Sequence, residues 1–180
     1  HSGCYHPIWS HQGGLIVVMP SNPADAAGLM RTALRAGDPV LFLEHKKLLA
    51  TNGDVPDRSH MVPFGQARIA REGEDVTVVS CGYMTTCCLE AVDRLDASGV
   101  SCELIDLVSI NPLDVDTIVE SVSKTGRLLV VDEGFPFCGL GAEIGQSMME
   151  HGFDYLDAPI GRLHTDPMAT PFSPVLEAET

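Results

Sequence analysis

Four potential metal ligands lie close together at the start of the chain: His1, Cys4, His6 and His11. Imidazole and thiolate groups are ligands that zinc prefers, so this group could bind such an ion. The spacing matches no standard ligand pattern, however, and a loop that holds an active-site or solvent-exposed histidine is the alternative. We favour the loop over the metal site.

A glycine-rich stretch from Asp132 to Gly141 follows an apolar run and precedes a helical pattern. Ligands of open α/β sheets gather where strands end, and a helix N-terminus attracts anions. Gly139 and Gly141 lack the third glycine and the later acidic residue that mark dinucleotide binding. We therefore favour a tight turn that requires small residues over an anion site.

The cysteines carry no sign of catalysis or cross-linking. Cys81 ends an apolar run with neither His nor Lys close in sequence to activate a thiolate, and Cys87 and Cys88 are adjacent in a helical pattern that favours core filling. None of the six forms a CxxC pair, which indicates reduced, buried thiols in a reducing compartment. The charged residues 44–47 are interpreted as a solvated strand exit.

Short apolar runs alternate with amphipathic segments along the whole chain. The runs predict strands at residues 15–19, 40–43, 67–70, 76–80, 102–106, 128–131 and 159–163. Apolar residues at helical spacing predict helices at residues 23–36, 84–97, 114–123 and 141–150. This alternation is typical of an α/β fold with a largely parallel sheet.

The segment 45–63 loses the apolar period and carries Gly, Pro and scattered charge, which predicts a linker. The strand–helix–strand unit before it is too small to close a sheet around its own core. We therefore expect residues 15–43 to be the least stable part of the chain, because their strands lack neighbours.

The charge balance excludes several classes of partner. The chain has 11 Lys and Arg against 25 Asp and Glu, a formal net charge of −14. Phosphate backbones and anionic lipid surfaces would repel such a protein, so we expect no nucleic-acid partner and no membrane. No apolar run reaches the roughly 18 residues that a membrane span needs.

Six segments together resemble the β subunit of the thiamine-diphosphate-dependent 2-oxo acid dehydrogenase first component, E1. The family includes the pyruvate, branched-chain 2-oxo acid and acetoin enzymes. The segments cover almost the whole chain in order and are residues 15–21, 38–46, 71–79, 111–118, 124–128 and 153–160.

The resemblance implies a C-terminal fragment of that subunit. Residues 1–46 would end a transketolase-type pyrimidine-binding domain, and residues 47–63 would link it to the next domain. Residues 64–180 would form a three-layer α/β/α domain like the transketolase C-terminal domain. The glutamate that contacts the cofactor aminopyrimidine would precede residue 1, and the Mg²⁺ motif belongs to the α subunit.

The same resemblance assigns one catalytic residue and one metal site. His1 matches the family's His-Ser-Gln motif, in which the histidine acts as a proton donor or stabilises the acyl intermediate, although Gly3 replaces the usual Gln. In some relatives the turn that holds Ala33, Ala36 and Asp38 binds a structural K⁺. Thiamine diphosphate and Mg²⁺ are implied as cofactors of the intact α2β2 assembly.

The implied reaction is decarboxylation of a 2-oxo acid on thiamine diphosphate and acyl transfer to lipoamide of the E2 core. The implied partners are the E1 α subunit, a second β subunit and E2, in the bacterial cytoplasm or the mitochondrial matrix. Two alternatives are a non-catalytic module for assembly and E2 docking, and another transketolase-like thiamine diphosphate enzyme.

Overall fold

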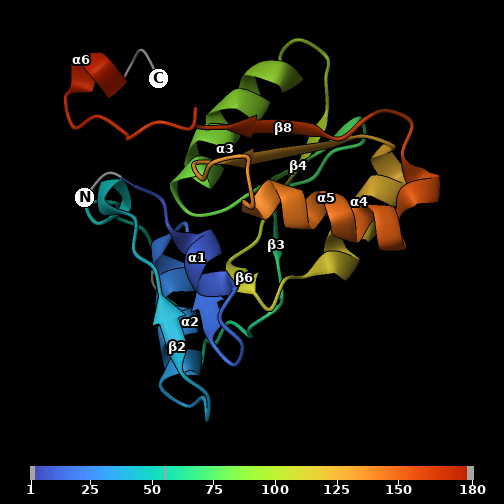
Figure 1. The fold of residues 1–180 in the computed structure, drawn as a ribbon. Helices are drawn as coiled ribbons and strands as arrows, with labels where there is room; N and C mark the ends of the chain where they lie inside the picture. The colour runs from blue at the N-terminus through green and yellow to red at the C-terminus, as the bar shows by residue number, and fades with distance from the viewer. Residues whose placement is uncertain (1–2, 55, 178–180) are drawn as a thin grey trace.

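The structure is a computed structural model that describes residues 3–54 and 56–177 (Figure 1). Its helices and strands in chain order are α1 (His6–Ser10), β1 (Ile16–Val18), α2 (Pro23–Ala33), β2 (Val40–Phe42), η1 (Lys46–Leu48), β3 (Arg68–Arg71), β4 (Val76–Ser80), α3 (Tyr83–Asp96), β5 (Cys102–Asp106), β6 (Ser109–Asn111), α4 (Val115–Thr125), β7 (Leu128–Asp132), α5 (Leu140–His151), η2 (Phe153–Tyr155), β8 (Gly161–His164) and α6 (Pro174–Glu177).

The larger sheet has five strands in the order β3-β5-β4-β7-β8. The strands β5, β4, β7 and β8 pair in parallel, and β3 joins β5 in the antiparallel sense. Central strands of such a sheet are covered on both faces, which explains why β4 and β7 are continuous apolar runs in the sequence. The predicted α/β class is confirmed.

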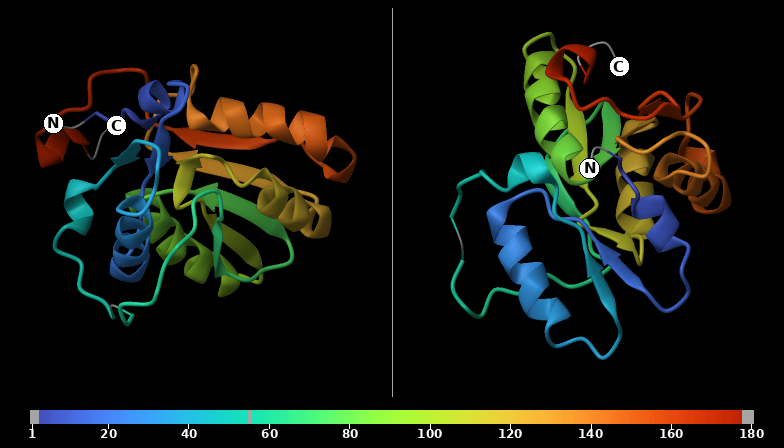
Figure 2. Two further views of the ribbon diagram at one scale, coloured as in Figure 1. Left: turned by 90° about the horizontal axis from the view of Figure 1, so that it is seen from below. Right: turned by 60° about the vertical axis from the view of Figure 1, so that its left-hand side comes forward.

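Helices cover both faces of this sheet, with α3 and α5 on opposite sides (Figure 2). Val78 of β4 packs in a buried cluster with Cys88 and Val92 of α3. The next residue, Val79, points to the other face and belongs to the cluster that holds Ile118 of α4. This alternation confirms the three-layer α/β/α arrangement.

Local signals in the sequence place the ends of α4. Asp114 accepts a hydrogen bond from the Thr117 N–H and so caps the first turn. Lys124 lies in the last turn, where a positive charge suits the helix dipole. Gly126 follows with a φ of 69°, a left-handed conformation that glycine adopts without strain.

The smaller sheet has the order β2-β1-β6, and its third strand was not predicted. The sequence around Asn111 indicated only a turn, whereas β6 pairs with β1 in the antiparallel sense. Strand β1 therefore has neighbours on both sides, and Val17 and Val18 are fully buried. The expectation that the strands of residues 15–43 lack neighbours is wrong for β1.

Hydrogen exchange should separate the two strands of the N-terminal unit. We expect the amides of Val17 and Val18 to exchange slowly, because β1 is central and buried. Strand β2 is an edge strand with three half-buried residues, so its amides should open earlier. Equal protection of β1 and β2 in exchange followed by mass spectrometry would contradict this structure-based expectation.

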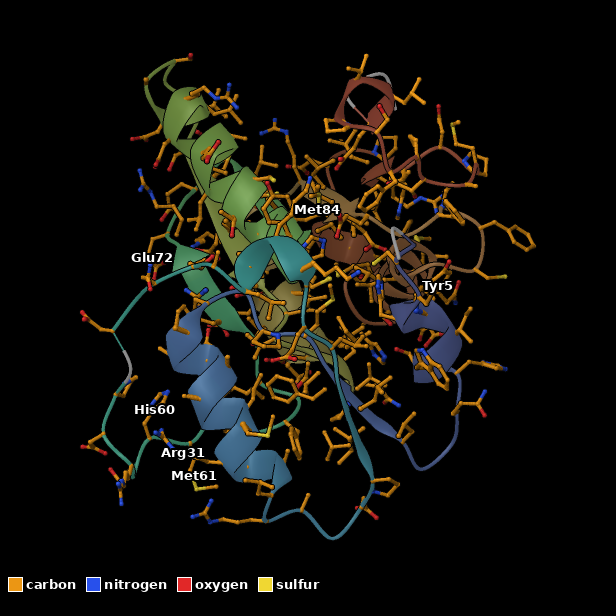
Figure 3. The ribbon with its side chains drawn as sticks, turned by 90° about the vertical axis from the view of Figure 1, so that its left-hand side faces the viewer. Tyr5, Arg31, His60, Met61, Glu72 and Met84 are labelled. Carbon is orange, nitrogen blue, oxygen red and sulfur yellow. The ribbon has the colours of Figure 1, made fainter. Side chains whose placement is uncertain are left out.

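The segment predicted to be a linker runs along α2 (Figure 3). Arg31 of α2 donates a hydrogen bond to the His60 carbonyl at 3.0 Å, and Thr32 donates one to the Val62 carbonyl at 2.7 Å. The side chain of Val62 also packs against a small buried cluster that includes Leu29. These contacts attach this part of the segment to the N-terminal unit.

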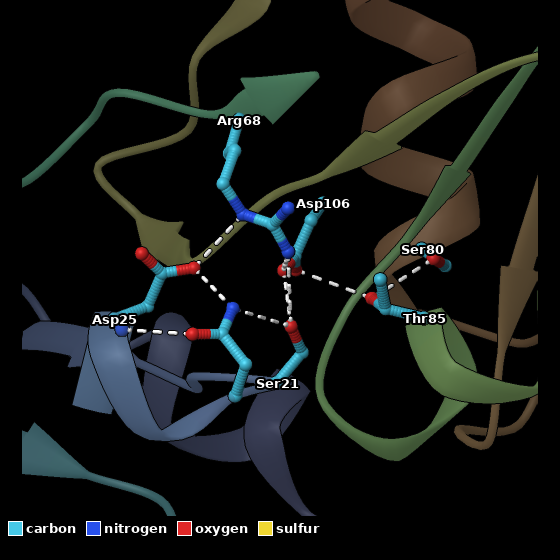
Figure 4. A network of polar contacts seen from close by, with 7 residues as sticks. Ser21, Asp25, Arg68, Ser80, Thr85 and Asp106 are labelled. Carbon is cyan, nitrogen blue, oxygen red and sulfur yellow. Dashed lines mark hydrogen bonds and ion pairs between the residues drawn. The ribbon is translucent and has the colours of Figure 1, made fainter. Parts of the chain in front are cut away.

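A polar network joins the two sheets (Figure 4). Arg68 of β3 donates from Nε to Asp25 of α2 and from Nη2 to Asp106 at the end of β5, each at 2.9 Å. Asp106 is fully buried and also accepts hydrogen bonds from Ser21 and Thr85. Burial raises the pKa of Asp106 above its usual value, while the hydrogen bond from Ser21 and the charge of Arg68 oppose that rise.

Candidate functional site

A cavity of about 430 Å³ lies where two parallel strands of each sheet end. Its walls include Met19 after β1, Leu43 after β2, Glu133 after β7 and Thr165 after β8. Ligands of open α/β sheets gather at the carboxyl ends of strands. Gly3, Cys4, Tyr5 and His6 close another side, so the segment that follows His1 in the sequence opens onto this cavity.

His6 lies at the start of α1 and is buried, with 1% of its surface exposed. The predicted loop and solvent exposure are therefore wrong for this residue, whereas an active-site role stays a prediction. Its Nδ1 lies 3.1 Å from the sulfur of Cys4, and its Nε2 lies 3.3 Å from Oδ1 of Asp132. The imidazole thus stands between a thiol and a carboxylate.

The electrostatics of this group keep Cys4 a thiol and Asp132 a carboxylate. Burial, together with the negative charges of Asp132 and Glu133, raises the pKa of Cys4 to about 12. Burial alone would raise the pKa of Asp132, but the adjacent His6 imidazole outweighs it and lowers that pKa. Cys4 therefore lacks the thiolate character that a nucleophile needs at neutral pH.

A second imidazole approaches the same carboxylate from β8. Nδ1 of His164 lies 3.1 Å from the Gly134 carbonyl and 3.9 Å from Oδ2 of Asp132. The His164 side chain is 4% exposed, and a methyl group added to Gly141 would come within 2.6 Å of its Nε2. Gly141 thus allows α5 to lie close to β8. This close approach agrees with the interpretation of the stretch from Asp132 to Gly141 as a turn that requires small residues.

Glu133 holds a third imidazole, that of His45, on the cavity wall. Nε2 of His45 lies 3.1 Å from the Glu133 carboxylate, and Nδ1 accepts a hydrogen bond from the Lys47 N–H. The ring stacks on Tyr83 with 4.9 Å between centroids. Both nitrogens of His45 have partners, so the ring forms part of the cavity wall. The interpretation of residues 44–47 as a solvated strand exit is wrong for His45, because this side chain is half-buried.

The other predicted positions fall in different places. His1 lies outside the described residues. His11 is the C-cap of α1 and is exposed, and it is not one of the residues that line the cavity. The turn from Ala33, at the end of α2, to β2 holds the predicted K⁺ residues Ala36 and Asp38, and that site stays a prediction.

The described cysteines are all free thiols. Cys81, Cys88 and Cys102 are buried as predicted, and burial raises the pKa of Cys81 well above its usual value. Cys138 is exposed, which corrects the expectation of buried thiols for that residue. Cys4 is half-buried, and its exposure depends on tertiary contacts that the sequence pattern does not contain.

Sequence reasoning missed the two carboxylates that organise the site. Asp132 and Glu133 were considered only as part of a glycine-rich turn. Their position directly after a buried strand was a usable signal, because polar side chains at the end of a parallel strand face the site edge of the sheet. Nothing in the sequence indicated that three histidines from α1, the β2 exit and β8 would meet them.

No helix among residues 3–54 and 56–177 is long and apolar enough to cross a bilayer. Residues 65–180 match the family described as transketolase, C-terminal domain. A solved structure titled "Split gene transketolase, inactive beta4 tetramer" superimposes with a TM-score of 0.77 over 96% of this chain and 55% of that one. Its sequence identity is 23%, so the likeness concerns the fold.

Curated relatives extend the match to the N-terminal unit. The pyruvate dehydrogenase E1 component subunit beta of Rickettsia felis is 46% identical over 98% of this chain and 54% of its own length. The acetoin:2,6-dichlorophenolindophenol oxidoreductase subunit beta of Cupriavidus necator is 43% identical over 98% of this chain and 52% of its own length. A mitochondrial pyruvate dehydrogenase E1 beta subunit of Dictyostelium discoideum is 41% identical. The chain spans about half the length of these relatives, and it belongs to the transketolase C-terminal domain family.

Proposed function

We propose that the chain is part of the β subunit of a thiamine-diphosphate-dependent 2-oxo acid dehydrogenase E1 component. The observation that carries this proposal is identity of 43% to 46% to pyruvate and acetoin enzyme β subunits over 98% of the chain. The match therefore includes the N-terminal unit, β1 and the cavity as well as the C-terminal domain. The assembled enzyme would decarboxylate a 2-oxo acid and transfer the acyl group to lipoamide of E2, in the bacterial cytoplasm or the mitochondrial matrix.

The cavity walls indicate how this chain would contribute to cofactor binding. Glu44, Glu133 and Glu177 bring three carboxylates to the cavity against the ammonium groups of Lys46 and Lys47, and Lys47 is paired with Glu177 at 2.6 Å. A diphosphate is repelled by such a surface and needs Mg²⁺ or several amide and cationic donors. The described residues do not suit the diphosphate end of thiamine diphosphate. In our proposal the diphosphate and its Mg²⁺ are held by the E1 α subunit.

This chain's contribution is the wall that faces the reacting end of the cofactor. Thiamine diphosphate supplies the carbanion chemistry when it is bound, while the protein orients the substrate and excludes water. Cys4 and Tyr5, which follow His1 in the sequence, line the cavity beside Trp9 and Leu43. We propose His1 as the proton donor or acyl-intermediate stabiliser at this wall, since imidazole titrates near neutral pH.

We also keep K⁺ as a proposed ligand of the turn after α2. The Ala33 carbonyl accepts a hydrogen bond from the Ala36 N–H at 3.2 Å, which leaves its second lone pair for another partner. Asp38 is exposed in the same turn. Carbonyl and carboxylate oxygens are the donors that hard cations prefer.

Calorimetry and turnover together test the proposed function. The isolated 180-residue chain should show no micromolar binding of thiamine diphosphate with Mg²⁺, because its cavity suits no diphosphate. The full-length β subunit, copurified with its α subunit, should bind the cofactor and reduce an artificial acceptor when a 2-oxo acid is added. Micromolar binding by the isolated chain would contradict the division of the site between subunits. A complex that assembles on E2 without turnover would favour the non-catalytic module instead.

A further inference from the structure

Three ligand-bearing side chains meet beside the cavity, and the proposed thiamine chemistry uses none of them. One potential ligand atom each from Cys4, His6 and Asp132 lies within 4.8 Å of the other two. They come from the N-terminal segment, α1 and the end of β7, so only the tertiary fold brings them together. The cluster differs from the one considered in the sequence, because it contains Asp132 and, among the described residues, lacks His11.

Two of these groups are buried without a hydrogen-bond partner of good geometry among the described residues. Nε2 of His6 and Oδ2 of Asp132 have no such partner, and the two residues are 1% and 3% exposed. Buried polar atoms are nearly always satisfied by protein, water or an ion. Two such atoms in neighbouring side chains therefore indicate that a polar species belongs close to them.

The separation of His6 and Asp132 suits a shared ion better than a direct hydrogen bond. Nε2 of His6 lies 3.3 Å from Oδ1 of Asp132, a contact that is long and not aligned for hydrogen bonding. Two ligand atoms that each lie about 2.0–2.1 Å from a tetrahedral zinc ion are about 3.3–3.4 Å apart. The observed distance thus matches two adjacent corners of a zinc coordination shell.

The donor set selects the class of ion. A sulfur, an imidazole nitrogen and a carboxylate oxygen suit zinc and its divalent neighbours, whereas Mg²⁺ and Ca²⁺ prefer oxygen donors throughout. We propose that Cys4, His6 and Asp132 bind one divalent ion of the zinc class, with its fourth position open to the cavity. A thiolate and a carboxylate balance the two positive charges of the ion.

The surroundings provide access and support for such an ion. Cys4 and His6 line the cavity, so the ion can enter from it and keep a water molecule as its fourth ligand. The Gly134 backbone helps to lower the pKa of Asp132, and Nδ1 of His164 lies 3.9 Å from the same carboxylate. These contacts orient the Asp132 carboxylate, as residues that contact the metal ligands do in zinc sites. On binding, the Cys4 thiol releases its proton to solvent, and its side chain turns from Nδ1 of His6 toward the ion that Nε2 and Asp132 share.

Titration of the purified 180-residue chain tests this site without any thiamine chemistry. We expect one Zn²⁺ to bind with micromolar or tighter affinity by calorimetry, and Co²⁺ to give a thiolate-to-metal absorption band. Trp9 is the chain's one tryptophan and lies on α1 with His6, so its fluorescence should report binding. His6→Ala and Asp132→Asn should each weaken binding at least about tenfold to a hundredfold.

Matched variants keep the test specific. Cys4→Ser should remove the Co²⁺ absorption band, while His11→Ala and Cys138→Ala, which change exposed residues, should alter neither affinity nor spectrum. If circular dichroism shows that His6→Ala is unfolded, the metal affinity and the Co²⁺ spectrum of the unmodified chain are compared with those of Cys4→Ser and Asp132→Asn instead. Absence of saturable binding, or binding that His11→Ala weakens as much as Asp132→Asn, overturns the proposal and leaves Cys4, His6 and Asp132 as a hydrogen-bonded group. Either result leaves the proposed E1 function unaffected, because that function is tested by turnover.

Discussion

His1→Ala in the full-length β subunit, assembled with its α subunit, is expected to lower the rate of lipoamide acylation by about 10²- to 10⁴-fold. That is the usual effect of removing a positioned acid or base. The Kd for thiamine diphosphate should change little, because the walls described here do not suit the diphosphate end of the cofactor. Turnover and cofactor affinity are measured on the same preparation.

His11→Ala is the matched control for this substitution. His11 lies in the same segment, is exposed and lies outside the Cys4 cluster, so its removal should leave both turnover and affinity near the wild-type values. A purely structural role for His1 would instead raise the cofactor Kd in step with the loss of turnover. That outcome, or a His1→Ala enzyme with nearly normal turnover, would end the catalytic assignment.

The Gly3 departure from the family motif would then be the first feature to examine. A Cβ atom at position 3 would lie 2.2 Å from the end of the Tyr5 ring. A glutamine at this position therefore requires Tyr5 to turn away from its place on the cavity wall. Gly3 and Tyr5 therefore fit together in this chain.

The largest loss of stability is expected for Arg68→Met. This change leaves Asp25 and the fully buried Asp106 without their shared cation, while the methionine preserves much of the aliphatic packing. Removing one partner of a buried ion pair costs about 3–5 kcal/mol. The Arg68 side chain is 38% exposed, so water compensates in part, and we expect about 3 kcal/mol in the free energy of unfolding by urea.

Arg71→Met provides the comparison on the same strand. Arg71 pairs with Asp93 and Asp96 of α3, both of which have side chains that are 60% exposed. Exposed pairs of this kind contribute about 1 kcal/mol or less. The double variant Arg68→Met/Asp106→Asn should recover part of the loss, because it removes the uncompensated charge. Equal destabilisation by Arg68→Met and Arg71→Met would show that the polar network between the sheets contributes little.

Much of the fold follows from local patterns in the sequence. The runs that form β4 and β7 are apolar because both faces of the sheet are covered, and such runs are visible without any knowledge of their partners. Helix α2 begins where Asn22 accepts the Asp25 N–H and Pro23 supplies its fixed φ. Capping and periodicity involve residues a few positions apart, so the sequence alone determines the class of fold and most of its elements.

The pairing of β6 with β1 was decided by the tertiary structure. Three residues, Ser109–Asn111, contain too little pattern to predict a strand, and their partner lies more than 90 positions earlier in the chain. The same holds for α1, which is one short helix of five residues. Such elements are stabilised by contacts with distant parts of the chain, and propensity has little influence on them.

For the cavity and the Cys4, His6 and Asp132 cluster, too, the sequence determined one part and the tertiary structure decided the rest. The sequence alone showed that Cys4 and His6 are potential metal ligands two residues apart, and it favoured a loop over a metal site there. Only the fold places them beside Asp132, more than 120 positions further along the chain, where His6 and Asp132 are buried and Cys4 is half-buried. A side chain's neighbours, and therefore its pKa and its ligands, depend on which distant segments pack against it, and residue types and spacing contain no record of that packing.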